Sequence, residues 1–410
     1  MAVTYRLQGA TATEREHTVP LDYAAPDRGT ITVFTREVAA TGGESRPYLL
    51  FLQGGPGHEA TRPTSPPSGW MKRALQDYRV LLIDQRGVGR STPVGVSIPG
   101  EGQAAQAEYL THFRADSIVR DAELIRQELG VDHWSILGQS FGGFCSMTYL
   151  SIAPQGLREA LITGGLSPIG RPIDDVYRAT WVRTLRKNRE YFERYPDDRA
   201  RARDIFSRLE AEDVRLPNGD RLTARRFRQL GGWLGDSAGF ENLHHVLELP
   251  FGSNAFLHDA ETGAMRFARN PIYATLHESS YADGMATRWS AARLMPAEIE
   301  VEGFFSAEHV FPWMFDDYGW LRPHREAAGV LAEHEWPPLY DAEVLRANDV
   351  PVAATIYVND LYVERDFAEE TAATIRGLKP WITNEFEHNG LRADGDHVLG
   401  RLIDLVRGRR

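Results

Sequence analysis

Short apolar runs that end at tight turns are the feature that most constrains the fold of this chain. They span residues 48–52 (Tyr-Leu-Leu-Phe-Leu), 79–83 (Arg-Val-Leu-Leu-Ile) and 134–137 (Trp-Ser-Ile-Leu), and a glycine follows each run within a few residues. Strands without alternation of apolar and polar residues are typical of a parallel sheet that is buried on both faces. The three runs therefore predict strands of a parallel sheet.

Helices are predicted between and after these strands. Ile118, Ala122, Ile125 and Leu129 recur at helical spacing, and Gly130 ends the pattern. Alternating strands and helices indicate a doubly wound, mostly parallel α/β sheet. Further strands are predicted at residues 30–39, 160–163, 350–358 and 381–386, and further helices at residues 367–375 and 399–406.

The alternation of strands and helices is interrupted in the middle of the chain. Residues 168–338 are charged, aromatic and helical in character, without a convincing buried strand. A helical block inserted into an α/β sheet is typical of a cap. We therefore expect an α/β domain made of residues 1–167 and 339–410, and a mainly helical cap domain made of residues 168–338.

Charge and cysteine content exclude several classes of function. The 410 residues contain 46 basic and 57 acidic side chains, a net charge of −11, so we expect no nucleic-acid partner. The single cysteine, Cys145, excludes an internal disulfide and a cysteine cluster, and we expect no metal site.

The N-terminus is polar and no stretch approaches the roughly 20 apolar residues that span a bilayer, which predicts a cytoplasmic protein with no membrane partner. Homo-oligomer formation stays open.

Residues 138–142 (Gly-Gln-Ser-Phe-Gly) form the strongest chemical motif. This Gly-x-Ser-x-Gly pattern directly follows a predicted strand and precedes a predicted helix. In so sharp a turn the flanking positions have no room for side chains, and the serine hydroxyl is exposed above the edge of the sheet. The motif therefore predicts an α/β-hydrolase fold with Ser140 as its nucleophile. The alternative is a glycine-rich turn that only packs a helix against a strand, and the strand–turn–helix context disfavours it.

Two backbone amides are candidates for an oxyanion hole. The N–H of Phe141 follows the nucleophile and belongs to the start of the next helix, where a developing negative charge is stabilised. Residues 53–57 (Gln-Gly-Gly-Pro-Gly) follow an earlier strand, where this fold places its second donor. We expect the N–H of Gly55 to be that donor, with Gly54 as its neighbour, because glycine lets the backbone approach a ligand closely.

A serine nucleophile requires a base, and the base requires an orienting carboxylate. In this fold the order along the chain is serine, acid, histidine. Asp360 follows one predicted strand and His388 follows the next, so both lie at carboxyl ends of strands, where sites of open α/β sheets form. We predict Asp360 as the acid and His388 as the base. His397 is the alternative base, and Asp366 and Asp394 are alternative acids with poorer placement.

Several motifs together resemble one family. Residues 53–57, 84–87 (Asp-Gln-Arg-Gly) and 138–143 (Gly-Gln-Ser-Phe-Gly-Gly) are similar to the proline iminopeptidases, most of all to their longer bacterial branch. The resemblance continues through residues 357–363 (Tyr-Val-Asn-Asp-Leu-Tyr-Val) and 386–392 (Phe-Glu-His-Asn-Gly-Leu-Arg), so it covers the catalytic core nearly end to end. The glutamine of the first motif replaces a histidine that is common in the wider family, although the longer branch often has glutamine.

The resemblance implies an enzyme that removes an N-terminal residue, usually proline. Such an enzyme binds the free amine of short peptides through glutamates of the cap. Two segments look similar to that recognition region: residues 276–281 contain Glu278, and residues 305–309 contain Glu308. Two carboxylates above the nucleophile suit a cationic amine through charge-assisted hydrogen bonds. The alternative is that both glutamates are exposed helix charges.

Aromatic side chains near these two segments are candidates for the wall of a proline-sized pocket. Tyr281, Phe311 and Trp313 are the candidate substrate contacts, with Trp289 nearby. Packing in the core of the cap is the alternative for each of them.

The expected function is that of a metal-independent serine aminopeptidase, which needs no cofactor and acts on short peptides with a free N-terminal proline. A carboxylesterase or amide hydrolase acting on a neutral small molecule is the second hypothesis, because the same machinery supports many reactions. A catalytically silent binding protein is the third, and the ordered presence of Ser140, Asp360 and His388 argues against it. The orientation of the two cap glutamates decides between the first two hypotheses.

Overall fold

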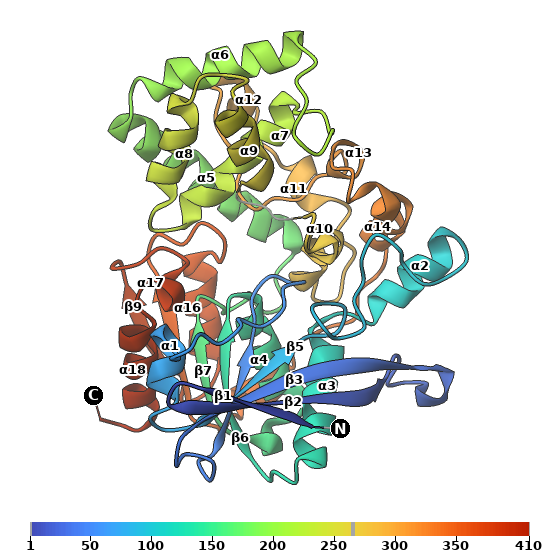
Figure 1. The fold of residues 1–410 in the computed structure, drawn as a ribbon, viewed down its shortest axis with the longest axis vertical. Coiled ribbons are helices and arrows are strands. Elements are labelled where there is room, and N and C mark those ends of the chain that lie inside the picture. Colours follow the sequence, from blue (N-terminus) through green and yellow to red (C-terminus); the bar gives the residue numbers. More distant parts are fainter. Residues whose placement is uncertain (1, 264–266, 410) are drawn as a thin grey trace.

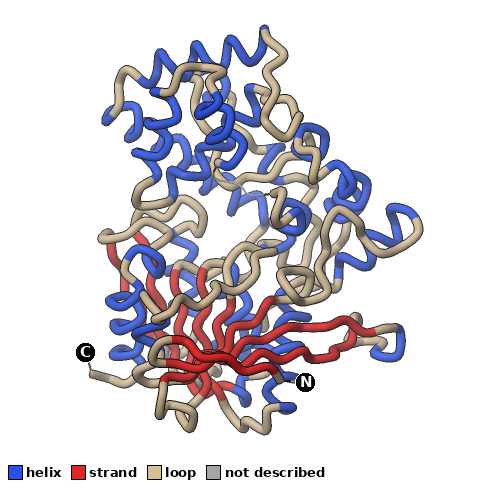
Figure 2. The backbone as a smooth tube through the Cα atoms, viewed as in Figure 1, coloured by secondary structure: helices blue, strands red, loops and turns tan. Residues whose placement is uncertain are grey.

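A mixed sheet forms the base of the molecule, and most helices lie above it or against its two faces (Figure 1). The computed structural model describes residues 2–263 and 267–409. Figure 2 shows the strands gathered at one end of the molecule, where both chain termini also lie. The strands are β1 (Val3–Leu7), β2 (Ala10–Pro20), β3 (Thr30–Ala40), β4 (Tyr48–Leu52), β5 (Arg79–Asp84), β6 (Trp134–Gln139), β7 (Leu157–Thr163), β8 (Val352–Tyr357) and β9 (Lys379–Thr383).

The sheet has the strand order β1-β2-β3-β5-β4-β6-β7-β8-β9. All neighbours from β5 to β9 are parallel, whereas β1, β2 and β3 are joined to each other and to β5 in antiparallel fashion. The carboxyl ends of β4, β6, β8 and β9 therefore lie at one edge of the sheet. That edge is where ligand sites of open α/β sheets form.

Helices cover both faces of the parallel part of the sheet. In β4, Leu49 and Phe51 pack on one face with α1 and α18, while Leu50 and Leu52 pack on the other with α3 and α4. All five residues of β4 are buried, as a strand between two helical layers requires. The helices outside the cap are α1 (Gly69–Ala74), α2 (Gly102–Thr111), α3 (Ala115–Glu128), α4 (Phe141–Ile152), α15 (Ala342–Arg346), α16 (Arg365–Thr374), α17 (Gly390–Ala393) and α18 (Gly395–Val406).

We use "the cap" for residues 168–338, which connect β7 to β8 and lie above the carboxyl edge of the sheet (Figure 1). Apart from an isolated bridge between Arg215 and Arg221, the described part of this segment contains only helices, turns and loops. Of all helices in residues 2–263 and 267–409, none combines the length and the hydropathy that a membrane crossing demands. The helices of the cap are α5 (Ile173–Arg194), α6 (Asp198–Ala211), α7 (Ala224–Arg228), α8 (Gly239–Glu248), α9 (Asn254–Thr262), α10 (Pro271–Leu276), α11 (Ser290–Arg293), α12 (Glu298–Val301), α13 (Met314–Asp317) and α14 (Arg325–Ala332).

The predicted elements differ from the structure at both edges of the sheet. The N-terminal hairpin β1–β2 was not expected, because β1 is exposed and the sequence of β2 is mostly polar, so neither strand has the apolar runs that mark the central strands. The last strand begins and ends earlier than predicted, at Lys379–Thr383, because it is an exposed edge strand with little apolar pattern. The boundaries between the α/β domain and the cap domain stay a prediction.

Candidate active site

Ser140 lies in a sharp turn between β6 and α4. Its backbone has φ 56° and ψ −123°, a conformation that L-amino acid residues other than glycine rarely adopt. The flanking glycines make this turn sterically feasible: a Cβ on Gly138 would lie 2.2 Å from the carbonyl oxygen of Gly142, and a Cβ on Gly142 would lie 1.9 Å from that of Leu52. The sequence pattern thus produces a turn that presents the serine hydroxyl at the carboxyl edge of the sheet.

Ser140, His388 and Asp360 form a continuous hydrogen-bonded series. The Nε2 atom of His388 lies 2.8 Å from the Oγ atom of Ser140, and its Nδ1 atom lies 2.8 Å from the Oδ2 atom of Asp360. The other carboxylate oxygen of Asp360 accepts hydrogen bonds from the backbone amides of Tyr362 (2.9 Å) and Val363 (3.0 Å). The structure therefore brings together the three side chains that the sequence nominates, in the geometry that activates a serine.

The electrostatics of His388 suit a general base. Burial disfavours its charged form, but the charge of Asp360 and the hydrogen bond to it outweigh burial, so the pKa of His388 is raised above its ordinary value of 6.5. A neutral imidazole in this position can accept the serine proton, and the carboxylate then stabilises the imidazolium that forms.

Backbone amides lie beside the serine hydroxyl. Phe141 is the first residue of α4, so its N–H is one of the amides that have no partner inside the helix. Gly54 and Gly55 line the same cavity as Ser140. A Cβ on Gly54 would lie 2.9 Å from the carbonyl oxygen of Gln139 and 3.0 Å from the Cβ of Ser140, so only glycine fits this close to the nucleophile.

The Asp-Gln-Arg-Gly segment begins at the last residue of β5 and does not line the cavity; its first two side chains hydrogen-bond to the glycine-rich loop and the residues after it. Asp84 accepts hydrogen bonds from the backbone amide of Ala60 (3.2 Å), at the end of that loop. Gln85 donates its side-chain amide to the carbonyl oxygen of Gln53 (3.0 Å). Arg86 is buried and pairs with Asp121, and it also donates to three backbone carbonyls.

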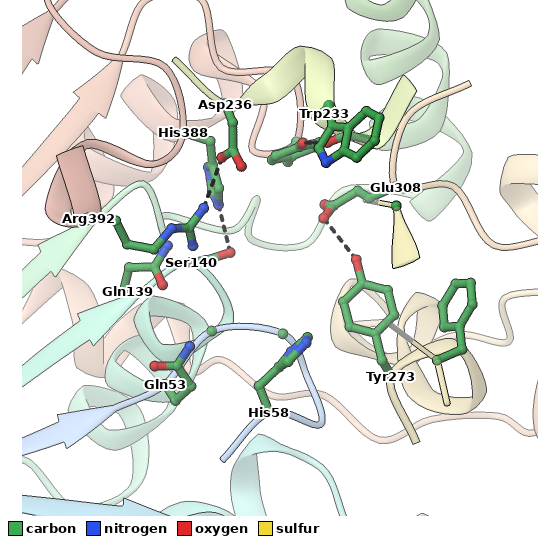
Figure 3. Close-up of a pocket in the computed structure, with 16 residues that line it drawn as sticks. Gln53, His58, Gln139, Ser140, Trp233, Asp236, Tyr273, Glu308, His388 and Arg392 are labelled. Carbon is green, nitrogen blue, oxygen red and sulfur yellow. Dashed lines mark hydrogen bonds and ion pairs between the residues drawn. The ribbon is translucent and has the colours of Figure 1, made fainter. Parts of the chain in front are cut away.

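A cavity of about 430 Å³ opens above Ser140 between the sheet edge and the cap (Figure 3). Its size falls within the range of small-ligand pockets. Figure 3 shows Glu308 and Tyr273 on one side of the Ser140–His388 pair and Arg392 on the other. The lining residues are Gln53, Gly54, Gly55, His58, Gln139, Ser140, Gly232, Trp233, Asp236, Gly263, Phe267, Tyr273, Glu308, Tyr362, His388 and Arg392.

Glu308 is the predicted cap glutamate that reaches this cavity. The hydroxyl of Tyr273 donates a hydrogen bond to its Oε2 atom at 3.0 Å, and the Nε2 atom of His277 lies 3.9 Å from its Oε1 atom. Burial raises the pKa of Glu308 to about 7, opposed by the nearby charge of His388 and by the Tyr273 hydrogen bond. A carboxylate that is poorly solvated in this way favours the approach of a cation.

Glu278 does not reach the cavity, which corrects the prediction that two glutamates face Ser140. Its carboxylate accepts hydrogen bonds from the backbone amides of Ala291 (2.9 Å) and Ser290 (3.2 Å) at the start of α11. Burial raises its pKa to about 7. Two consecutive residues with positive φ, Arg288 and Trp289, precede this helix, so Glu278 stabilises a strained turn inside the cap.

The predicted aromatic contacts are also placed away from Ser140. Tyr281 lines a much smaller cavity of about 10 Å³ that shares Glu308 and Tyr362 with the larger one, and its hydroxyl donates to the carbonyl oxygen of Tyr362 (3.2 Å). Phe311 is buried and stacks on Trp313, with ring centroids 5.4 Å apart. Phe311 and Trp313 thus pack within the cap, which was the alternative interpretation of these side chains.

The alternative base and acids lie outside the cavity. His397 belongs to α18, is nearly half exposed, and lies 3.9 Å from Glu385. Asp394 accepts a hydrogen bond from the backbone amide of His397 at the start of the same helix. Asp366 lies in the first turn of α16 and is exposed.

Several cavity residues were not foreseen, and most come from the cap. Tyr273 belongs to the short helix α10, and Trp233 and Asp236 lie at the end of the 3-10 helix Gln229–Gly235 or just after it. No local motif marks these positions, because they come together only when distant segments fold over the sheet edge. Arg392 could have been noticed, since it follows the predicted base by four residues.

Comparisons with known proteins agree with this geometry. A family model described as the alpha/beta hydrolase fold matches residues 47–250. A proline iminopeptidase from Aeromonas sobria is 49% identical over 420 aligned residues, which cover 98% of this chain and 98% of that protein. The proline iminopeptidase aneH from Aspergillus aculeatus is 33% identical over 419 aligned residues, which cover 95% of this chain and 92% of that protein.

Other matches are shorter or more distant. A tripeptidyl aminopeptidase from Streptomyces coelicolor is 26% identical over 187 residues, or 37% of this chain and 34% of that protein. Among solved structures, a malate-bound thermophilic esterase from Thermogutta terrifontis matches with a TM-score of 0.46 and 12% identity, covering 96% of this chain and 98% of that one. The predicted fold class is confirmed by the family model and the two long alignments.

Proposed function

The chain belongs to the proline iminopeptidase family of α/β hydrolases, and on that premise we propose that it releases N-terminal proline from short peptides by acyl transfer at Ser140. The observation on which the proposal depends is the hydrogen-bonded series Ser140–His388–Asp360 in one cavity with Glu308. This arrangement provides a nucleophile and a site for a cationic amine at opposite ends of one short substrate residue.

The first half of the reaction acylates the enzyme. The Oγ atom of Ser140 attacks the carbonyl carbon of the N-terminal residue while Nε2 of His388 accepts the hydroxyl proton. Asp360 holds the imidazole in the required tautomer and stabilises its positive charge. The N–H groups of Phe141 and Gly55, with Gly54 as neighbour, donate to the oxyanion that forms on the carbonyl oxygen.

The second half releases the products. His388 returns its proton to the leaving amine of the shortened peptide, and the scissile C–N bond breaks. Water, deprotonated by the same imidazole, then attacks the prolyl ester on Ser140, and free proline leaves. Every proton moves between Ser140, His388, the substrate and water, so the mechanism requires no cofactor.

Glu308 is proposed to select the free N-terminus. Its carboxylate lies in the cavity with one oxygen hydrogen-bonded to Tyr273, and charge-assisted hydrogen bonds to an ammonium group are stronger than neutral ones. An internal peptide bond offers an uncharged amide at the corresponding position, so it gains nothing from Glu308. The aromatic side chains of Phe267, Trp233 and Tyr362 line the same cavity and suit the apolar ring of proline.

The domain limits and the setting of the enzyme are part of the proposal. Residues 1–167 and 339–410 form the catalytic domain, and residues 168–338 form the cap that completes the substrate site. The cytoplasmic location stays a prediction from the sequence, and the oligomeric state stays open.

The test is hydrolysis of proline arylamide by the wild-type protein and by Ser140→Ala, together with mass spectrometry of the acylated enzyme. We expect release of the aromatic amine, a prolyl adduct on the peptide that contains Ser140, and a loss of at least about 10³-fold in kcat in the variant. Unchanged turnover in Ser140→Ala, or an adduct on another residue, would contradict the proposal.

A further inference from the structure

The segment that contains the base is attached to the cap at several successive residues. The backbone N–H of His388 donates to the carbonyl oxygen of Gly235 in the cap (3.1 Å). The next residue, Asn389, accepts hydrogen bonds from the backbone amide (3.2 Å) and the hydroxyl (2.7 Å) of Ser237. Arg392 donates to Asp236 (2.9 Å), an ion pair visible at the cavity wall in Figure 3.

The residue before the base is attached to the cap by a buried charge. The Nζ atom of Lys187, in α5, lies 2.6 Å from the Oε1 atom of Glu387. Lys187 is only 3% exposed. The other carboxylate oxygen of Glu387 is buried and has no hydrogen-bond partner among the described residues, so Lys187 is the contact that fixes this side chain.

The segment that contains the acid is attached to the same helix. Arg183 donates through Nε (2.9 Å) and Nη2 to one carboxylate oxygen of Glu364, and through Nη1 to the carbonyl oxygen of Val358 (3.2 Å). Val358 and Glu364 flank Asp360 on its two sides along the chain. Arg183 thus spans the loop that presents the acid.

Arg183 and Lys187 are four residues apart, so they project from the same face of α5. One face of one cap helix therefore contacts both the acid loop after β8 and the base loop after β9. Figure 1 shows the C-terminal segments, in red, rising from the sheet to meet the cap.

We propose that α5, through Lys187 and Arg183, is a positioning element that sets the His388–Asp360 pair relative to Ser140. The proposal rests on the proposed function only in taking Ser140 as the nucleophile. Ser140 is fixed by the turn between β6 and α4, whereas the other two side chains lie in loops whose outer contacts come from the cap. Because a misplacement of about 1 Å can cost about 100-fold in rate, these contacts matter for chemistry as well as for folding.

The test compares the wild type with Lys187→Met, which keeps an unbranched side chain one atom shorter than lysine and removes its charge. We expect kcat for proline arylamide to fall by about 10- to 100-fold while KM changes by less than about threefold. The rate at which a fluorophosphonate labels Ser140 is expected to fall by the same factor as kcat, because labelling depends on the base and not on peptide binding. Arg178→Met is the matched control. Arg178 lies on α5 and is exposed, and within residues 2–263 and 267–409 its ion pairs are with Asp174 and Asp175 of its own helix, so the rates of this variant should stay at the wild-type level.

A double variant separates positioning from simple charge compensation. Lys187→Met with Glu387→Met removes the buried carboxylate that the single variant leaves unpaired, so Tm should recover. If α5 positions the base, kcat and the labelling rate stay low in the double variant. Recovery of both rates together with Tm, or wild-type labelling in Lys187→Met, would overturn the proposal.

A second variant applies if Lys187→Met does not fold. Arg183→Gln acts on the acid loop and is expected to show the same fall in kcat and labelling with little change in KM, and unchanged rates would overturn the proposal equally. Absence of labelling in the wild type would instead refute Ser140 as the nucleophile, so the two failures are distinguishable.

Discussion

The α/β domain and the cap fix their functional groups by different means. In the α/β domain the backbone does this work: the conformation of Ser140 follows from the glycines around it, and two backbone amides hold the carboxylate of Asp360. In the cap, side chains hold side chains: Glu308 lies in a loop and is bonded to Tyr273 of another element.

Reactivity therefore depends mainly on the α/β domain, and selectivity depends mainly on the cap. The turn at Ser140 cannot be altered without affecting the reaction itself, whereas the Glu308–Tyr273 contact in the cap can be altered while the serine stays reactive. The α5 contacts are where the two parts meet, since there the cap acts on the base and the acid.

The largest effect is expected from Asp360→Asn, which tests the α/β domain alone. The amide would favour the wrong imidazole tautomer, so kcat for proline arylamide should fall by about 10⁴-fold. Competitive inhibition by free proline should change little, because the amine site in the cap is intact. A large rise in the inhibition constant of proline would show that reactivity and selectivity are not separable in this way.

A pair of glycine variants is expected to show the next largest effect. Gly142→Ala would place a Cβ 1.9 Å from the carbonyl oxygen of Leu52, so the turn at Ser140 cannot form and both Tm and activity should drop sharply. In the cap helix α14, a Cβ on Gly329 meets no atom within 4 Å, so Gly329→Ala should raise the stability by about 0.5–1 kcal/mol. Thermal unfolding of both variants checks this, and equal tolerance at the two sites would remove the contrast.

The pH dependence of kcat/KM should reveal one group from each part. Below about pH 7, Glu308 becomes protonated and loses its attraction for the amine. His388, whose pKa is raised above 6.5, also becomes protonated and can no longer accept the serine proton. The acid limb should therefore approach a slope of two protons in the wild type and one proton in Glu308→Gln. The same slope in both proteins would show that Glu308 does not titrate in this range.

The smallest effect concerns the cost in folding stability of burying the charged carboxylate of Glu308. The pKa of Glu308 in the folded protein, about 7, is higher than the ordinary 4.5, so the folded state binds more protons between these values and its stability falls as pH rises through that window. Glu308→Gln should therefore raise Tm by a few degrees at pH 8 and by much less at pH 4. A Tm that is unchanged at pH 8 would indicate a well-solvated carboxylate.

The sequence predicts those parts of the fold whose pattern lies within one short segment of the chain. The central strands β4 to β8 were predicted because buried strands leave continuous apolar runs, and β4 was predicted with its observed limits. The hairpin β1–β2 and the limits of β9 were missed because β1 and β9 are solvent-facing edge strands and the sequence of β2 is mostly polar, so none of the three has a strong apolar pattern. Helices of the cap were predicted as a block without individual limits.

The same distinction applies to the site residues: those marked by a local motif were predicted, and those placed by tertiary packing were not. Ser140, Asp360 and His388 each follow a predicted strand, so chain order and strand ends were enough to bring them together. Glu278 and Glu308 have similar sequence surroundings, and only the packing of α11 determines that the first is bound to backbone amides while the second lines the cavity. Tertiary packing of this kind leaves no periodic signal in the sequence.

The most direct test of amine recognition by Glu308 is the ratio of kcat/KM for proline arylamide to kcat/KM for a short-chain aryl ester without an amine, measured in the wild type and in Glu308→Gln. We expect the ratio to fall by about 10- to 100-fold in the variant, the range expected for losing one charged hydrogen bond, while ester turnover is unchanged. An unchanged ratio would show that Glu308 does not bind the amine of the substrate. A parallel loss of both activities would show that the cap glutamate acts on the reaction itself, and the separation of reactivity from selectivity would be wrong.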